Sequence, residues 1–190
     1  MKILALDSSG LVASVALMED DRLTAEYSIQ YKKTHSQTLL PMMDEVKKMV
    51  ELDLDTLDAV AIAAGPGSFT GLRIGSATAK GIGFALDIPL IEVPTLEGLA
   101  YNAYGFDGYV CPMMDARRGQ VYTGIYEFIK EKEDGIHMQE IHMADFGSTK
   151  KTVTFEEWHE LLMDYAELRG GNAADAEAWR DDYEAGKSPV

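Results

Sequence analysis

The sequence predicts an α/β protein made of two units. Short apolar runs of strand length alternate with longer segments of helical periodicity, and the first 105 residues give the order βββαβαβα. After about residue 106 the pattern changes to successive strands. We therefore expect one unit over residues 1–105 and a second, smaller unit over residues 106–190.

The first unit opens with three predicted strands. Residues 2–6 form an apolar run that ends at Asp7-Ser8-Ser9-Gly10, and residues 12–18 alternate well enough to be its hairpin partner. Residues 22–31 supply the third strand. The sequence therefore predicts a small antiparallel sheet before the first helix.

Helices and strands then alternate. Thr34 is a plausible N-cap for a helix over residues 35–50, whose apolar stripe consists of Leu39, Met42, Met43, Val46, Met49 and Val50. A buried strand near residues 60–64 ends at Gly65-Pro66-Gly67, and a long helix begins near Ser68. A strand over 89–93 and a helix over 95–104 complete the unit.

The helix after Ser68 carries small residues at every fourth position. Gly71, Gly75, Ala79 and Gly83 therefore lie on one helical face. A glycine inside a helix costs about 1 kcal/mol relative to alanine, so this face predicts close packing against another element. Periodicity leaves two alternatives open: a sheet of the same domain, or a helix of another chain.

The second unit begins with two predicted strands, over residues 109–114 and 120–129, joined by a turn at 115–119. Thr154 and Glu157 form a capping-box pattern for an amphipathic helix over 155–168. Residues 170–190 contain fewer apolar side chains, although Trp179 and Tyr183 are spaced for a short helix over 173–185.

Composition excludes several classes of function. A formal net charge of -15 repels phosphate backbones, so direct binding of nucleic acid is not expected. No apolar run approaches the roughly 20 residues that span a bilayer, and the first residues lack a signal-peptide pattern, which predicts a cytoplasmic protein with no membrane contact. The single Cys111 is expected to be a buried reduced thiol rather than a nucleophile.

Two turns carry residues that could hold a phosphate. A carboxylate, two hydroxyls and a glycine follow the first strand, and the turn at 65–68 precedes a helix N-terminus, where backbone N–H groups bind anions. An ordinary hairpin turn and an ordinary strand-to-helix turn are the alternatives. The candidate nucleotide cleft consists of Asp7, Ser8, Ser9, Gly65 and Gly67.

No metal site, cofactor or catalytic residue is predicted. His35, His137, His142 and His159 are scattered, without the i, i+4 pair that a helical metal site needs. The sequence contains no G-x-S-x-G elbow, Walker lysine loop or Cys–His arrangement.

Several segments together resemble the TsaB family: LDSS at 6–9, THSQTLLP at 34–41, AAGPGSFTGLRIG at 63–75 and VPTLEGLA at 93–100, with DARRGQVYTGIY at 115–126. That family is the non-catalytic dimerisation subunit of the bacterial machinery that makes N6-threonylcarbamoyladenosine beside the tRNA anticodon. The resemblance implies an actin-like, Hsp70-like and sugar-kinase-like (ASKHA) α/β fold with two lobes, the second abbreviated here and atypical at its C-terminal end.

The resemblance also implies partners and a binding surface. The helices after Thr34 and Ser68 are expected to pack against TsaD, and TsaE is expected to join the pair in a ternary complex. The isolated chain is expected to form a homodimer, and tRNA to be contacted only indirectly. In TsaD two histidines ligate a metal where this chain has Thr95 and Leu99. The expected interface comprises His35, Leu39, Met42, Met43, Val46, Phe69, Gly71, Leu72, Gly75 and Ala79.

Two consequences of this interpretation can be checked. If the glycine stripe admits a partner, a bulky residue at Gly75 should abolish association and leave the monomer folded. The rival hypothesis from the enzyme class is a small actin-like phosphotransferase that binds ATP at the two turns, and ATP binding by the purified chain would favour it.

Overall fold

The computed structural model describes residues 1–31, 34–131, 135–141 and 152–154. The chain divides into two units, Met1–Leu99 and Ala100–Val190. The helices predicted at 155–168 and 173–185 lie outside the described residues.

The first unit contains a five-stranded mixed sheet in the order β3-β2-β1-β4-β5. Strands β1 (Lys2–Asp7), β2 (Ala13–Glu19) and β3 (Arg22–Ile29) form an antiparallel meander. Strands β4 (Ala59–Gly65) and β5 (Leu90–Pro94) extend the sheet in parallel from β1. Alternate residues of β1 and β2 are buried because successive side chains of a strand point to opposite faces of the sheet, and one face is covered by helices.

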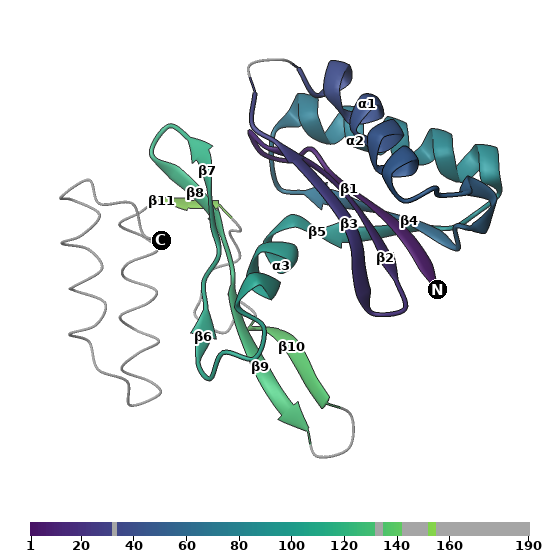
Figure 1. Ribbon diagram of the computed structural model, residues 1–190. Helices are drawn as coiled ribbons and strands as arrows, with labels where there is room; N and C mark the ends of the chain where they lie inside the picture. The colour runs from purple at the N-terminus through teal and green to yellow at the C-terminus, as the bar shows by residue number, and fades with distance from the viewer. Residues whose placement is uncertain (32–33, 132–134, 142–151, 155–190) are drawn as a thin grey trace. The chain divides into compact units, whose positions relative to one another are not determined.

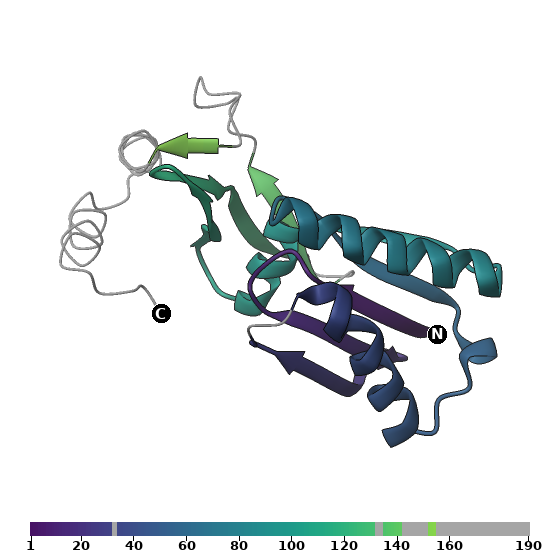
Figure 2. The same cartoon turned by 90° about the horizontal axis from the view of Figure 1, so that it is seen from above.

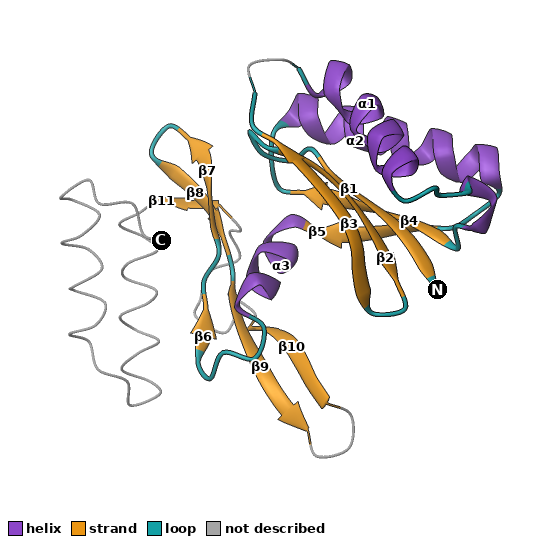
Figure 3. Cartoon of the chain, viewed as in Figure 1, coloured by secondary structure: helices purple, strands orange, loops and turns teal. Residues whose placement is uncertain are grey.

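Two long helices, α1 (His35–Met49) and α2 (Phe69–Leu86), cover the same face of this sheet (Figures 1, 2 and 3). A single turn of 3-10 helix at Leu54–Thr56 precedes β4, and α3 (Thr95–Ala100) and a 3-10 turn at Tyr101–Ala103 follow β5. The predicted order βββαβαβα is therefore confirmed. Among the described residues, no helix combines the length and the apolar character needed to cross a bilayer.

The core of this unit lies between the sheet and the two helices α1 and α2. Its buried apolar side chains include Leu4, Leu6, Val15, Leu17, Leu39, Met42, Val46, Val60 and Ile62. Burying each such side chain contributes roughly 1.5–3 kcal/mol, so this layer holds α1 to the strands. Met49 departs from the predicted stripe, because at the last position of α1 its side chain is 83% exposed.

The small-residue stripe of α2 packs inside the unit. Gly71, Gly75, Ala79 and Gly83 are the buried residues of this helix. A Cβ atom at Gly71 would overlap the carbonyl oxygen of Ser8, and one at Gly75 would lie 2.5 Å from Ser8 Oγ. The helix therefore needs Gly71 and Gly75 to approach the turn after β1, and Gly83 to approach Leu90 of β5.

The second unit contains two three-stranded sheets. One has the order β10-β9-β6, and the other has the order β11-β8-β7. The strands are β6 (Tyr109–Val110), β7 (Met113–Arg117), β8 (Gln120–Thr123), β9 (Ile125–Glu131), β10 (Gly135–Ile141) and β11 (Thr152–Thr154).

Each of the two strands predicted for this unit is interrupted. The first breaks at Cys111 and Pro112, because a proline has no N–H to donate to a strand ladder. The second breaks at Gly124, where a Cβ atom would lie 2.9 Å from the ring of Tyr126. Strand β10 was not predicted, although Ile136 and Met138 alternate with polar residues.

Two glycines of α2 test the packing of its buried stripe. Gly71→Ala should lower the free energy of unfolding by about 2 kcal/mol or more, because the backbone of Ser8 must move. Gly81→Ala should leave it unchanged or raise it by up to about 1 kcal/mol, since nothing lies within 4 Å of the added Cβ. Urea unfolding of both variants measures the difference. Equal effects would contradict the internal role of the stripe.

Cys111, predicted to be buried, is half-buried, and the burial of its thiol raises the pKa to about 12. Only the thiolate reacts with thiol reagents, and this pKa leaves about a thousandth of the thiolate that an exposed cysteine has at pH 8. We expect labelling of the native protein at pH 8 to be slower than labelling in urea by at least about thirtyfold, because the thiolate of higher pKa is scarcer but more nucleophilic. Rapid labelling of the native chain at the rate seen in urea would show that Cys111 is accessible and reactive.

Candidate partner-binding surface and nucleotide turns

The structure brings the two predicted phosphate turns into direct contact. The turn after β1 holds Ser8 and Ser9, which are buried, while Gly65 ends β4 and Gly67 lies in the turn that follows. Gly65 has φ +111°, a conformation that side chains rarely allow. A Cβ atom at Gly67 would lie 2.5 Å from the carbonyl oxygen of Ser9, so the turns are packed without a gap there.

Hydrogen bonds within the unit occupy the polar groups of these turns. The backbone N–H of Ser9 donates to Asp7 Oδ1 at 2.7 Å, and that of Ser68 donates to the Ser9 carbonyl oxygen at 2.6 Å. The Ser8 hydroxyl donates to the Gly71 carbonyl oxygen at 2.8 Å, and the Gly65 N–H donates to Thr95 Oγ1 at 3.1 Å. A phosphate would have to displace these bonds to use the same donors.

The N-terminus of α1 joins the same cluster. The His35 ring donates from Nε2 to the carbonyl oxygen of Gly10 at 2.9 Å, and a Cβ atom at Gly71 would lie 3.3 Å from the ring. Ser68 caps α2, its hydroxyl accepting from the Gly71 N–H at 3.3 Å. The cluster thus fixes the starts of both long helices against the end of β1.

The structure separates the predicted interface residues into two groups. Leu39, Met42, Val46, Gly71, Gly75 and Ala79 are buried within the first unit, so their side chains are not available to a partner. The prediction that the glycine stripe faces a partner is corrected by this geometry: the stripe admits β1 and β4 of its own sheet. His35, Met43 and Leu72 are half-buried, and Phe69 is 73% exposed.

The opposite side of α2 is the exposed one. We call it the outer face of α2, and it consists of Phe69, Arg73, Ala77, Lys80, Gly81 and Phe84. Both phenylalanines are largely in solvent, Phe84 with an exposed fraction of 92%. The predicted interface included Phe69 of this face but none of its other residues, although the spacing of Phe69, Ala77 and Phe84 along the helix carried the signal.

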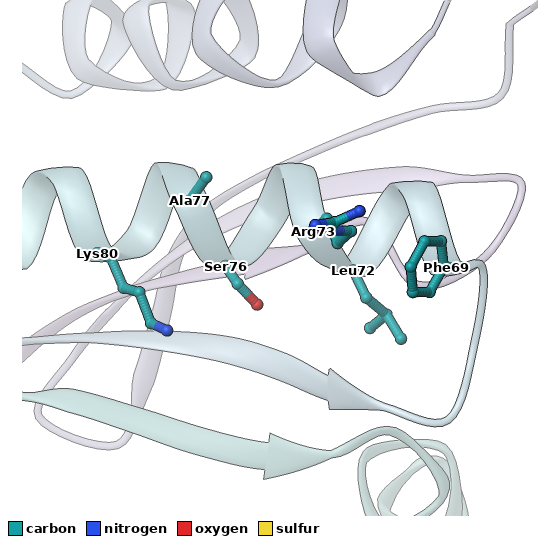
Figure 4. Close-up of a pocket in the computed structure, with 6 residues that line it drawn as sticks. All are labelled: Phe69, Leu72, Arg73, Ser76, Ala77 and Lys80. Atoms are coloured by element: carbon teal, nitrogen blue, oxygen red, sulfur yellow. The ribbon is translucent and has the colours of Figure 1, made fainter.

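A shallow hollow of about 440 Å³ lies along this face (Figure 4). Its lining residues all come from α2: Phe69, Leu72, Arg73, Ser76, Ala77 and Lys80. Leu72, Ser76 and Lys80 point to the same side of the helix from successive turns. The Arg73 guanidinium lies 5.0 Å from the centre of the Phe69 ring, a cation–π contact at a solvent-exposed site.

Thr95 and Leu99 stand where the resemblance places the metal ligands of TsaD. Thr95 is buried, and its hydroxyl accepts a hydrogen bond from the turn after β4. Leucine offers no donor atom to a metal. Within the described part of the chain, no three His, Cys, Asp or Glu side chains gather in an arrangement that could hold a metal ion.

Comparison with known proteins agrees with this fold. A family model described as TsaD, tRNA N6-adenosine threonylcarbamoyltransferase, matches residues 23–151. The tRNA threonylcarbamoyladenosine biosynthesis protein TsaB of Bacillus subtilis (strain 168) is 43% identical over 128 residues, which are 67% of this chain and 56% of that protein. TsaB of Escherichia coli (strain K12) is 36% identical over 138 residues, 72% of this chain and 58% of that protein.

A solved structure gives the same result. YeaZ from Pseudomonas aeruginosa superposes with a TM-score of 0.61 at 32% identity, covering 74% of this chain and 66% of that one. The shared sheet and helix arrangement defines an actin-like α/β protein. The chain therefore belongs to the TsaD-related family that the matching family model describes. Within that family it belongs to the TsaB proteins. It spans a little over half the length of the two TsaB relatives described above.

Ser8 tests whether the turn after β1 is structural. Ser8→Ala removes a buried hydroxyl that donates to the Gly71 carbonyl oxygen, so we expect a loss of about 1 kcal/mol in the free energy of unfolding. Ser14→Ala is the control, because its hydroxyl bonds to Ser28 at an exposed site and should change stability by less than about 0.5 kcal/mol. Equal stabilities for the two variants would argue against the structural role.

Proposed function

We propose that this chain is a non-catalytic subunit that binds a TsaD-related protein through the outer face of α2. Through that partner it takes part in making N6-threonylcarbamoyladenosine in tRNA. The names of its TsaB relatives and of the matching family model support the process. The observation that carries the surface is the pair of exposed phenylalanines on a helix that is otherwise packed on its own sheet.

Gly81 supports the same surface. It lies inside α2, is exposed, and has nothing within 4 Å of the position of its missing Cβ. Unlike the buried glycines, it therefore has no packing partner within the described residues that accounts for its cost of about 1 kcal/mol. A helix of another chain that approaches closely between Ala77 and Ala85 supplies such a reason. Leu40 of α1, which is 56% exposed, adds apolar area on the neighbouring helix.

The proposed mechanism is a population shift. A subunit that binds one conformation of its partner more tightly favours that conformation by the difference in affinity, without contributing a reacting group. TsaE then joins the pair, and the chain forms a homodimer when no partner is present. Because the net charge of -15 repels phosphates, the partner and not this chain contacts the tRNA backbone. The proposed site of action is the cytoplasm.

The nucleotide alternative is less well supported by the site. Three donors of the two turns, the Ser8 hydroxyl and the N–H groups of Ser9 and Ser68, already bond to oxygen atoms of the protein. An ATP titration followed by calorimetry tests it directly.

Gly81→Leu is the variant that tests the proposed surface. The new side chain meets open space in the monomer, so the melting temperature should not fall, while a closely packed partner is pushed away. We expect the Kd for the TsaD-related protein of the same organism to rise at least about tenfold, as one displaced close contact costs about 1.4 kcal/mol or more. Light scattering after size exclusion and calorimetric titration measure this.

Thr24→Leu is the matched control, since it adds the same exposed side chain on the edge strand β3. It should bind the partner as the wild type does. Wild-type affinity for Gly81→Leu would reject this face as the interface. A wild-type chain that ignores the partner and binds ATP would replace the scaffold proposal with the phosphotransferase.

A further inference from the structure

We propose that Arg73 and Lys80 make the outer face of α2 selective for a partner surface that carries carboxylates, and that they weaken pairing of two copies of this chain through the same face. This inference rests on the proposed function, in which that face binds another protein. It adds the charge that the partner must present and the reason for preferring it.

The charge of α2 is opposite to that of the chain. The whole sequence has 32 acidic and 17 basic residues, whereas Phe69–Leu86 contains two basic residues and no acidic one. Both basic residues lie on the outer face and are exposed. The face is therefore apolar and positive on an otherwise strongly negative molecule.

Neither charge is neutralised within the described residues. Arg73 stacks on Phe69, and no carboxylate forms an ion pair with Arg73 or Lys80 in the part of the chain that the structure describes. Lys48 of α1 shows the contrast, because its Nζ lies 2.6 Å from Asp44 Oδ2. Arg73 and Lys80 are thus left to interact with another molecule.

Their spacing disfavours a symmetric pair. Arg73 and Lys80 are seven residues apart, about 10.5 Å along the helix, with Ala77 between them. A two-fold axis beside the small residue Ala77 and perpendicular to α2 makes the helices antiparallel and sets Arg73 of one copy opposite Lys80 of the other. An axis along α2 makes them parallel and sets each basic residue opposite its own copy. Two like-charge contacts result, within the screening distance of about 10 Å at 0.1 M salt.

With a partner that carries carboxylates opposite Arg73 and Lys80, the electrostatic interaction is attractive instead of repulsive. Each contact becomes an attraction, and the planar guanidinium of Arg73 can bind a carboxylate with two hydrogen bonds. The apolar residues then contribute area to both kinds of pair, while the charges distinguish them. The same surface thereby favours the heterodimer over the homodimer.

The test measures both associations between 0.05 and 0.5 M NaCl, using the full chain alone and with the TsaD-related protein. Screening should tighten the homodimer and weaken the heterodimer, each by at least about threefold. The double variant Arg73→Gln with Lys80→Gln should weaken the heterodimer at least about fivefold, remove most of its salt dependence, and tighten the homodimer.

A matched variant separates this local effect from net charge. Arg22→Gln with Arg118→Gln removes the same two positive charges from β3 and from the turn between β7 and β8. On net charge alone both double variants should weaken self-association equally. The inference instead requires the α2 variant to strengthen it and the control variant not to.

The outcomes are distinguishable. A wild-type chain that fails to bind the partner defeats the proposed function and this inference with it. A wild-type chain that binds, with equal heterodimer affinity and salt dependence for the α2 variant, leaves the proposed function standing and overturns the inference. A homodimer that the α2 variant weakens as much as the control variant does also overturns it.

Discussion

The rest of the first unit depends on the close approach of α2 to the end of β1. The carbonyl oxygen of Ser8 occupies the space that a side chain at Gly71 would need, and the Ser8 hydroxyl donates to the Gly71 carbonyl oxygen. His35 binds the next part of the same turn through Gly10. The turn after β1 therefore contacts the starts of both long helices and sets the surface that α2 presents to solvent.

This contact also explains why donors of the two turns predicted to bind phosphate are already engaged within the protein. Serine hydroxyls and glycine N–H groups suit an anion only while they are free. Here the protein's own carbonyl and carboxylate oxygens accept from Ser8, Ser9 and Ser68. Residues that are typical of a nucleotide-binding turn can thus instead hold a strand and a helix together by hydrogen bonds.

The sequence predicted the order of elements in the first unit and the start of α2 at Ser68, because apolar periodicity and turn residues act locally. It could not decide which element fills the small-residue stripe, because any close neighbour imposes the same spacing of Gly71, Gly75 and Ala79. Phe69 was predicted to contact a partner, but the rest of the exposed face was missed, because an apolar residue such as Phe84 resembles a core residue until the sheet is placed. In the second unit, Pro112 and Gly124 divide strands that hydrophobicity alone makes continuous.

Helix α2 has two sets of positions that alternate along the same segment: one set packs inside the first unit, and the other is exposed to solvent. The inner positions are constrained by neighbouring atoms of the same unit. A substitution at Gly71 or Gly75 therefore lowers stability whether or not a partner is present. The outer positions contact no core, and a change at Arg73 or Lys80 is felt only on binding. The two sets of positions can therefore change at different rates during evolution. The surface that binds the partner can be altered without changing the residues that maintain the fold.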